Sequence, residues 1–251
     1  MEFIIDISDK RNIYVLEGLK KLGYKAYKLH EHIGSKQQVV YVFSPAVKLG
    51  DDVSNLKDNS TVFGGNQKDE VIKILEQKNI EYINIMQNEI FTIENAKLTA
   101  EGVLAVIFSC TEKSIYSNNI LVLGSGRCGK AILLLLDKLG VKASLGTFHK
   151  GSYESAHILT DNVISKEQLV SRIGEFDIII NTVPLEIITE EMITNMQSGV
   201  AIVEVASVNC ISTKLKEKYK LNYILAPALP KVYSAQSAGE IMLKHILKHF
   251  N

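Results

Sequence analysis

A glycine-rich turn at residues 124–129, Gly-Ser-Gly-Arg-Cys-Gly, constrains the fold of this chain more than any other feature. It follows an apolar run at residues 120–123 and precedes a run of helical period at residues 130–139. In such a strand–turn–helix unit the first glycine permits the tight turn, the second lets a pyrophosphate approach the backbone, and the third lets the helix pack on the strand. The alternatives are a purely structural turn and a fold that has lost its ligand. We interpret the turn as a dinucleotide-binding loop formed by Gly124, Ser125, Gly126, Arg127, Cys128 and Gly129.

The end of the next strand indicates which dinucleotide binds. An acidic residue there would pair with the ribose hydroxyls of NAD and repel a 2′-phosphate. Residues 147–152, Thr-Phe-His-Lys-Gly-Ser, contain no acid but offer a cation and hydroxyls. We therefore expect NADP(H) rather than NAD(H), although His149 and Lys150 could equally solvate a loop. The expected contacts are Thr147, His149, Lys150 and Ser152.

Three later strands end in loops that belong at the same carboxyl edge of the sheet, where open α/β folds bind ligands. They are residues 177–184 (DIIINTVP), 199–206 (GVAIVEVA) and 222–228 (NYILAPA). The polar side chains of the first loop would face the cofactor or, equally, cap the following turn. The predicted cofactor contacts in these loops are Asn181, Thr182, Val183, Pro184, Ala206, Ser207 and Pro227.

The whole chain alternates short β-rich runs with helical segments, which is typical of parallel sheets covered by helices. We expect an α/β protein with a C-terminal Rossmann doubly wound parallel sheet and a smaller N-terminal flavodoxin-like α/β domain. The expected N-terminal strands are residues 2–7, 26–30, 38–43 and 60–63, and the helices are 14–22 and 67–78. The predicted domains are 1–97, completed by a C-terminal helix at 236–251, a connecting helix at 98–116, and the Rossmann domain at 117–235.

Composition narrows the class of protein further. The chain has 28 basic and 28 acidic residues, so it lacks the positive charge that drives nonspecific nucleic-acid binding. Its three cysteines have no metal-binding or disulfide spacing, and we expect no metal. The longest apolar stretch, Ala131 to Leu136, is far below the ~20 residues that span a bilayer, and the N-terminus does not resemble a leader. We expect a cytoplasmic protein that binds neither nucleic acid nor membrane.

Four segments, read in order, carry a resemblance to a known family. They are TAEGVLAVIFSCTEKSIYSNNILVLGSGRCGKA, NTVP, EVAS and LAPALPKVYSAQSAGEIM. In this order the chain resembles the A subunits of dipicolinate synthase, from about Asn84 to the C-terminus. The resemblance implies an NAD(P)-dependent dehydrogenase that oxidises a dihydrodipicolinate-type precursor to dipicolinate in sporulation, beside a flavoprotein-like B subunit. Glu101 matches a glutamate of the family, and we expect a homo-oligomer.

The chain departs from the family pattern near the predicted substrate. Residues 208–210, Val-Asn-Cys, replace a Pro-Gly-Gly-type turn, and Glu204 replaces an aspartate. Ala228 and Lys231 replace the two glycines of an APGLPG pattern, and a Cβ there would narrow a pocket lined by backbone. These differences concern the substrate more than the cofactor.

Oxidation of a small dicarboxylate between the two domains needs carboxylate-binding groups and a proton acceptor. We hypothesise that Glu101, or a water held near Asn181, accepts the proton. Glu101 could instead only stabilise the first turn of a connecting helix capped by Thr99. The other readings are a shikimate-dehydrogenase-like enzyme and a dinucleotide-binding non-catalytic subunit. The expected carboxylate-binding residues are Ser44, Gly64, Gly65 and Asn66.

Overall fold

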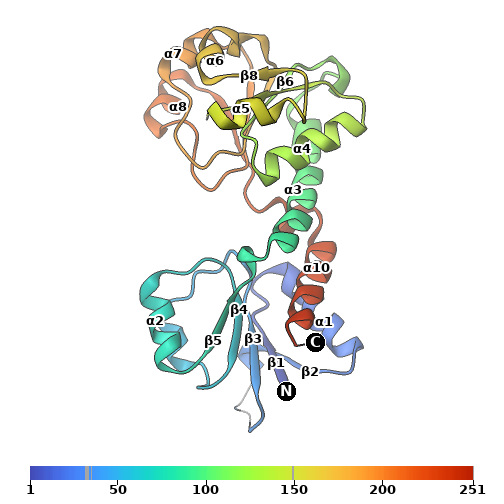
Figure 1. Cartoon of the computed structure of the whole chain (residues 1–251), viewed down its shortest axis with the longest axis vertical. Helices are drawn as coiled ribbons and strands as arrows, with labels where there is room; N and C mark the ends of the chain where they lie inside the picture. Colours follow the sequence, from blue (N-terminus) through green and yellow to red (C-terminus); the bar gives the residue numbers. More distant parts are fainter. Residues whose placement is uncertain (32–33, 35, 149, 251) are drawn as a thin grey trace. The chain divides into compact units, whose positions relative to one another are not determined.

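The structure, a computed structural model, describes residues 1–31, 34, 36–148 and 150–250. The chain forms two compact units (Figure 1). Unit 1 comprises Met1–Asn95 and Pro230–Asn251, and unit 2 comprises Ala96–Leu229. The chain therefore passes between the units after residues 95 and 229, whereas the sequence predicted domain limits at 97 and 235.

Unit 1 is built on a five-stranded parallel sheet in the order β2-β1-β3-β4-β5. This is the flavodoxin-like order, so the expected fold class is confirmed. The strands are β1 (Glu2–Ile5), β2 (Lys25–Lys28), β3 (Val39–Val42), β4 (Thr61–Gly64) and β5 (Glu81–Asn84). The edge strand β5 was not predicted, because its partly exposed residues lack the apolar run that marks the central strands.

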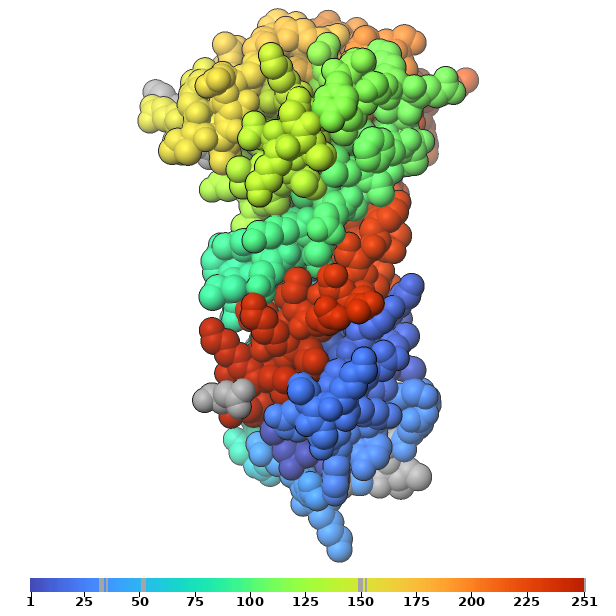
Figure 2. Space-filling view, turned by 90° about the vertical axis from the view of Figure 1, so that its right-hand side faces the viewer, coloured from blue at the N-terminus to red at the C-terminus, as the bar shows by residue number. Residues whose placement is uncertain are grey.

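Helices α1 (Lys10–Lys21) and α10 (Ala235–His249) pack against each other in unit 1. A Cβ atom at Gly239 would lie 2.4 Å from the carbonyl oxygen of Arg11, so glycine permits the close approach of the two helices. Figure 2 shows the C-terminal helix, in red, against α1, in blue. Helix α2 (Asp69–Gln77) also belongs to this unit. The last segment of the chain thus packs onto the N-terminal sheet.

Unit 2 is built on a six-stranded parallel sheet in the order β11-β10-β9-β6-β7-β8. This is the Rossmann order, with β6 at its centre and the switch in direction between β6 and β9. Alternate residues of the central strands enter two separate apolar cores, one on each face of the sheet. The strands are β6 (Ile120–Leu123), β7 (Ala143–Gly146), β8 (Val163–Ile164), β9 (Ile178–Asn181), β10 (Ala201–Glu204) and β11 (Asn222–Leu225).

Five helices follow the strands of this sheet, as a doubly wound fold requires. They are α4 (Arg127–Lys138), α5 (Lys150–Ala156), α6 (Lys166–Arg172), α7 (Glu190–Asn195) and α8 (Thr213–Tyr219). A short helix, α9 (Leu229–Tyr233), leads back to unit 1. Short 3₁₀ helices occupy Leu29–Glu31, Asp51–Asn55, Ile85–Gln87, Ile115–Ser117 and Ile173–Glu175.

The connecting helix predicted at residues 98–116 is wrong at both ends. Helix α3 spans Glu89–Cys110 and so begins nine residues earlier. Its first part, with the alternating polarity of an amphipathic helix, belongs to unit 1, and its more apolar second part belongs to unit 2. The sequence becomes more apolar at residue 98 because the helix has passed from unit 1 into unit 2, and not because a helix begins there. Within the described ranges, no helix combines the length and apolarity needed to cross a membrane.

Candidate functional site

The turn between β6 and α4 is fixed by two of its three glycines. Gly124 has a φ of 99°, a left-handed conformation that favours glycine, and its N–H donates to the carbonyl of Gly146 at 2.9 Å. A Cβ atom at Gly129 would lie 1.9 Å from the carbonyl oxygen of Gly124. Any larger residue at 129 would therefore push the first turn of α4 away from the strand.

The second glycine, Gly126, has no packing reason to be glycine. A Cβ atom there would meet nothing within 4 Å, and the residue is exposed. It is the N-cap of α4, a helix of 12 residues, and no side chain caps this end. The open end thus leaves helix N–H groups available beside a backbone without a side chain, which is the cradle that a pyrophosphate needs. This turn fits the diphosphate of a dinucleotide.

Cys128 lies in the first turn of α4 but is not activated by it. Burial raises the pKa of its thiol, and the nearby charge of Arg127 and a hydrogen bond with Thr99 only partly oppose this. The thiol is therefore neutral at pH 7 and is a poor nucleophile. Cys128 is therefore a small residue of the loop and not a candidate nucleophile.

The side chains of Asn181 and Thr182 hold the turn together, as in the alternative in which they cap it, while contact of the partly exposed Thr182 with a cofactor stays a prediction. The Thr182 hydroxyl donates to the carbonyl of Leu123 at 2.7 Å. Asn181 is completely buried; its amide donates to the carbonyl of Val183 at 2.9 Å, and its Oδ1 accepts the Val183 N–H at 3.0 Å. Because no part of Asn181 is exposed, it cannot hold a catalytic water against a substrate, and we do not retain it as catalytic.

A buried carboxylate that the sequence analysis did not single out as a site residue organises the ends of β9, β10 and β11. Glu204 is 2% exposed. Its Oε1 accepts hydrogen bonds from Asn181 Nδ2 at 2.7 Å and from the Ala206 N–H at 3.0 Å. Its Oε2 accepts from the Cys210 N–H at 2.7 Å and from the Tyr223 hydroxyl at 2.5 Å. We call these residues the Glu204 cluster. The signal for it was an acid inside the otherwise apolar run GVAIVEVA, since a buried charge needs partners.

The Glu204 cluster fixes the loop that carries two of the predicted cofactor contacts. Ala206 is half-buried and Ser207 is exposed immediately beyond β10, while Pro227 is exposed beyond β11. Val183 and Pro184 follow β9, and a Cβ atom at Gly124 would lie 2.7 Å from Cγ2 of Val183. The loops after β6, β9, β10 and β11 thus share the carboxyl edge of one sheet. Contact with a cofactor stays a prediction for these residues.

The residues expected to choose between NADP and NAD lie after β7. Thr147 is 3% exposed, its N–H donates to the carbonyl of Ile164 at 3.0 Å, and its buried hydroxyl has no hydrogen-bond partner in the described structure. His149 lies outside the described residues, as do the side chains of Lys150 and Ser152. The predicted preference for NADP therefore stays a prediction.

A second polar cluster lies at the carboxyl edge of the unit 1 sheet. Ser44, one of the predicted carboxylate-binding residues, is completely buried between Asp9 and Arg11. Its hydroxyl donates to Asp9 Oδ2 at 2.8 Å and accepts from Arg11 Nη2 at 2.7 Å. Arg11 also binds both carboxylate oxygens of Asp9, at 3.0 and 2.9 Å. Ser44 is therefore part of a buried ion pair that the sequence analysis missed.

The ion pair keeps Asp9 charged although it is buried. Burial by itself would raise the pKa of Asp9, but the hydrogen bonds and charge of Arg11 and the Ser44 hydroxyl outweigh it and lower the pKa from 3.8 to about 2. Asp9 is also the N-cap of α1 and accepts the Arg11 N–H at 3.0 Å. The pair is thus tied to the start of the helix.

The other predicted carboxylate-binding residues are Gly64, Gly65 and Asn66, and close packing explains why the first two are glycine. A Cβ atom at Gly65 would lie 1.9 Å from the carbonyl oxygen of Pro45, and one at Gly64 would lie 2.6 Å from the Tyr82 hydroxyl. Asn66 is exposed, and its Oδ1 accepts from Asn84 at 2.7 Å. Of the four predicted residues, only Asn66 exposes a side chain that a ligand could contact, and substrate binding by these residues stays a prediction.

Glu101 lies in the middle of α3 with its side chain exposed. The alternative in which Thr99 caps the helix and Glu101 stabilises its first turn is wrong, because the helix begins at Glu89. Glu101 therefore does not stabilise the first turn of this helix. Its role as a proton acceptor stays a prediction.

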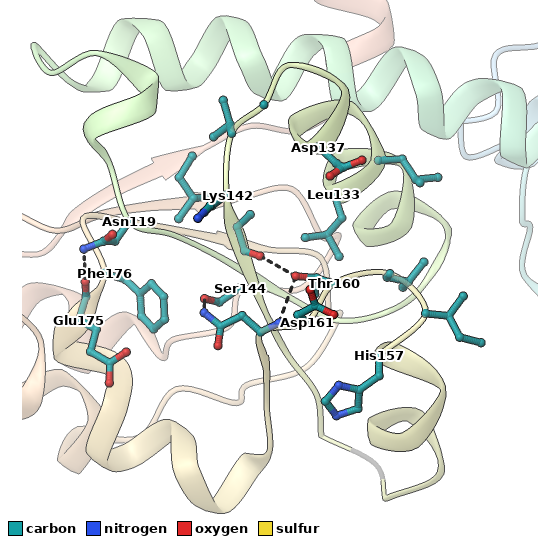
Figure 3. A pocket seen from close by; sticks show the side chains of 18 residues that line it. Asn119, Leu133, Asp137, Lys142, Ser144, His157, Thr160, Asp161, Glu175 and Phe176 are labelled. Atoms are coloured by element: carbon teal, nitrogen blue, oxygen red, sulfur yellow. Dashed lines mark hydrogen bonds between the residues drawn. The ribbon is translucent and has the colours of Figure 1, made fainter.

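A cavity of about 1050 Å³ lies at the opposite, amino-terminal edge of the unit 2 sheet (Figure 3). Two of its polar side chains bond within the lining: Thr160 Oγ1 donates to the Ala143 carbonyl at 3.2 Å, and Asn162 Nδ2 donates to Ser144 Oγ at 2.6 Å. The glycine turn is at the other edge of the same sheet, so this cavity does not belong to the predicted cofactor site. Within the described ranges, no three His, Cys, Asp or Glu side chains come together as a metal site.

Ala228 holds a conformation that suits glycine. Its φ is 53°, and its side chain is exposed. The left-handed region is unfavourable for a residue with a Cβ atom, whereas glycine enters it freely. We expect Ala228→Gly to raise the free energy of unfolding by about 0.5–1 kcal/mol, measured by urea titration. Unchanged or lower stability would show that the backbone is not strained there.

The comparisons with known proteins agree with this geometry. No family model matches the chain. It is 24% identical over 201 residues to the A subunit of dipicolinate synthase from Bacillus subtilis (strain 168), covering 79% of this chain and 67% of that protein. The resemblance stated from the sequence is thereby confirmed.

Solved structures show the same fold at low identity. The A subunit of dipicolinate synthase from Bacillus halodurans superposes with a TM-score of 0.86 and 18% identity, covering 99% of this chain and 97% of the other. A transhydrogenase from Sinorhizobium meliloti gives 0.69 and 14%, covering 99% and 93%. An L-alanine dehydrogenase gives 0.66 and 13%, covering 99% and 89%. The chain therefore shares with these structures a fold of two units, each built on a parallel sheet.

Proposed function

We propose that this chain is an NADP-dependent oxidoreductase that oxidises a dihydrodipicolinate-type precursor to dipicolinate, in the cytoplasm and during sporulation. The observation that carries the proposal is the open glycine turn at Gly126, at the carboxyl edge of a sheet with Rossmann order. The similarity to the A subunit of dipicolinate synthase supports an oxidoreductase-like role and suggests the substrate. The absence of an acid at residues 147–152 supports NADP over NAD.

The proposed reaction removes one hydride and one proton from a dihydropyridine dicarboxylate and leaves an aromatic ring. Bound NADP⁺ would supply the acceptor for the hydride. The gain of aromaticity supplies much of the driving force, so the protein has to orient the substrate, hold its carboxylates and accept the proton. Glu101 is our candidate acceptor, because it is an exposed carboxylate and matches a glutamate of the family that the chain resembles.

Nucleotide binding is the first test of this function. A ligand present at 100 times its dissociation constant stabilises the folded protein by ~2.7 kcal/mol, so NADP should raise the melting temperature clearly, and NAD should raise it less. Gly126→Asp should abolish this rise, because its carboxylate would occupy and repel the phosphate position. The melting temperature without nucleotide should change little, since a side chain at residue 126 meets open space.

Gly50→Asp is the matched control for that experiment. Gly50 also has open space around its Cβ position, but it lies in unit 1 at the N-cap of a 3₁₀ turn. The nucleotide-induced rise should be retained in this variant. If neither nucleotide raises the melting temperature of the wild-type chain, the proposed function is wrong.

The second candidate function is that of a dinucleotide-binding, non-catalytic subunit, and it is favoured because the relative is named as a subunit. That protein is one subunit of its synthase, so a partner such as a flavoprotein-like B subunit could carry part of the chemistry. Reduced-cofactor absorbance with a dihydrodipicolinate substrate separates the two functions. Turnover by the chain alone supports the enzyme, whereas NADP binding with turnover only after a second subunit is added supports the binding subunit.

A further inference from the structure

The buried ion pair of Asp9 and Arg11 has a lysine beside it, and the carboxylate of Asp9 makes no hydrogen bond to that lysine. Both oxygens of Asp9 are occupied: Oδ1 accepts two hydrogen bonds from Arg11, and Oδ2 accepts one from Arg11 and one from Ser44. The two side chains are only 4% and 6% exposed. The pair is therefore a rigid, electrically neutral unit that needs no further partner.

Lys231 brings a second positive charge to this unit. Its Nζ lies 3.8 Å from Asp9 Oδ2, beyond hydrogen-bond distance, and its side chain is 43% exposed. Among the residues with described side chains, none forms a hydrogen bond with this ammonium. The group of Asp9, Arg11 and Lys231 thus carries a net charge of +1, and its excess charge is at the solvent-accessible end.

The position of this ammonium is where parallel sheets bind ligands. Asp9 follows β1 and Ser44 follows β3, so the group lies at the carboxyl edge of the unit 1 sheet. Another lysine at this edge, Lys48, already donates to the carbonyl of Asn66 at 2.6 Å. An exposed lysine near an already saturated carboxylate adds little stability, ~0–1 kcal/mol at most. Its placement is better explained by an anion that it binds.

We propose that Lys231 binds a carboxylate of the substrate, with the Asp9–Arg11–Ser44 cluster as its rigid support. This inference rests on the proposed function for the identity of the ligand, a pyridine dicarboxylate. The ammonium would donate to a carboxylate oxygen in a charge-assisted hydrogen bond. Lys231 would thereby be a specificity-determining residue that selects a dicarboxylate over a monocarboxylate.

The test is calorimetric binding of pyridine-2,6-dicarboxylate and of pyridine-2-carboxylate to the full chain with NADP present. Lys231→Met should weaken binding of the dicarboxylate about tenfold, the size expected for one charge-assisted contact. Binding of the monocarboxylate should change less, so the preference of the wild type for two carboxylates should shrink. Lys231→Arg should restore most of the affinity.

Lys25→Met provides the matched control. Lys25 also lies 3.9 Å from a carboxylate, that of Glu2, and its side chain is 59% exposed, but it is at the amino end of the same sheet. This variant should bind both ligands as the wild type does. Equal dicarboxylate affinity in wild type and Lys231→Met, or no dicarboxylate binding to a wild type that binds NADP, would overturn the inference. Lys231-dependent binding without any nucleotide binding would uphold it and refute the oxidoreductase function.

Discussion

Replacing Glu204 by alanine is expected to lower the free energy of unfolding of unit 2 by about 3–5 kcal/mol, because the substitution leaves several buried donors without an acceptor. The carboxylate is 2% exposed and accepts four hydrogen bonds, from Asn181, Ala206, Cys210 and Tyr223. The donors belong to β9, to the loop after β10 and to β11, and this one carboxylate accepts from all three segments. Its removal should therefore loosen the loop after β10 as well as destabilise the sheet.

The measurement must resolve two units. The chain contains no tryptophan, so circular dichroism follows unfolding in urea, and hydrogen exchange read by mass spectrometry assigns the loss to unit 2. Exchange should rise most at residues 205–212 and around β11. NADP should also bind more weakly, since the loop that bears Ala206 and Ser207 is no longer fixed.

Glu190→Ala is the matched control for this prediction. Glu190 also accepts from a tyrosine hydroxyl, that of Tyr219 at 2.7 Å, and pairs with Lys218, but its side chain is 49% exposed. Its loss should change stability by less than about 1 kcal/mol. If Glu190→Ala and Glu204→Ala are equally mild, the Glu204 cluster does not support the fold.

The raised pKa of Tyr223, in the Glu204 cluster, predicts how its contribution to stability depends on pH. Burial, followed by the hydrogen bond to Glu204, raises the pKa of Tyr223 above its usual value of 10. A raised pKa means that the stabilisation is fully present below the ordinary pKa and is lost only when the pH rises through the higher one. The contribution of Tyr223 should therefore be constant from neutral pH to about pH 9. Tyr223→Phe should remove about 1 kcal/mol throughout that range.

The sequence predicted the sheets better than the contacts of the site. Apolar β-runs and a GxGxxG turn depend on local spacing, and they correctly predicted the central strands and the fold class. The partners of a polar side chain depend on strand register instead. Asn181 pairs with Leu123 on one side and with Glu204 on the other, and only this register shows that its amide is consumed inside the protein. Arg11 was missed for the same reason, because its partner Ser44 is 33 residues away and only the fold brings the two together.

Replacing Asp9 by asparagine is the second substitution expected to have a large effect, in unit 1. Asparagine is also a good N-cap, so the start of α1 keeps its cap and the change isolates the charge. It leaves the guanidinium of Arg11 buried without its counter-charge, which typically destabilises by about 3–5 kcal/mol. Urea unfolding should show this loss, and hydrogen exchange should place it in α1 and the strands that contact it.

The pH dependence of stability offers an independent check on the same pair. The pKa of Asp9 is lowered from 3.8 to about 2, so its contribution is present above the ordinary pKa and is lost as the pH falls through the lower one. A depression of nearly two pKa units corresponds to about 2.5 kcal/mol. The wild type should lose this amount between about pH 5 and pH 1, and Asp9→Asn should lose correspondingly less over that interval.

Asp58→Asn in the same unit is the control for Asp9→Asn, because it removes a carboxylate charge from an exposed ion pair instead of a buried one. Asp58 pairs with Lys78 at 2.5 Å, but the carboxylate is 63% exposed. An exposed pair of this kind contributes ~0–1 kcal/mol and is weakened by salt. Salt should therefore reduce the small effect of Asp58→Asn and leave that of Asp9→Asn nearly unchanged. Equal effects at the two positions would mean that solvent reaches Asp9, and that the rigid support assigned to Lys231 does not exist.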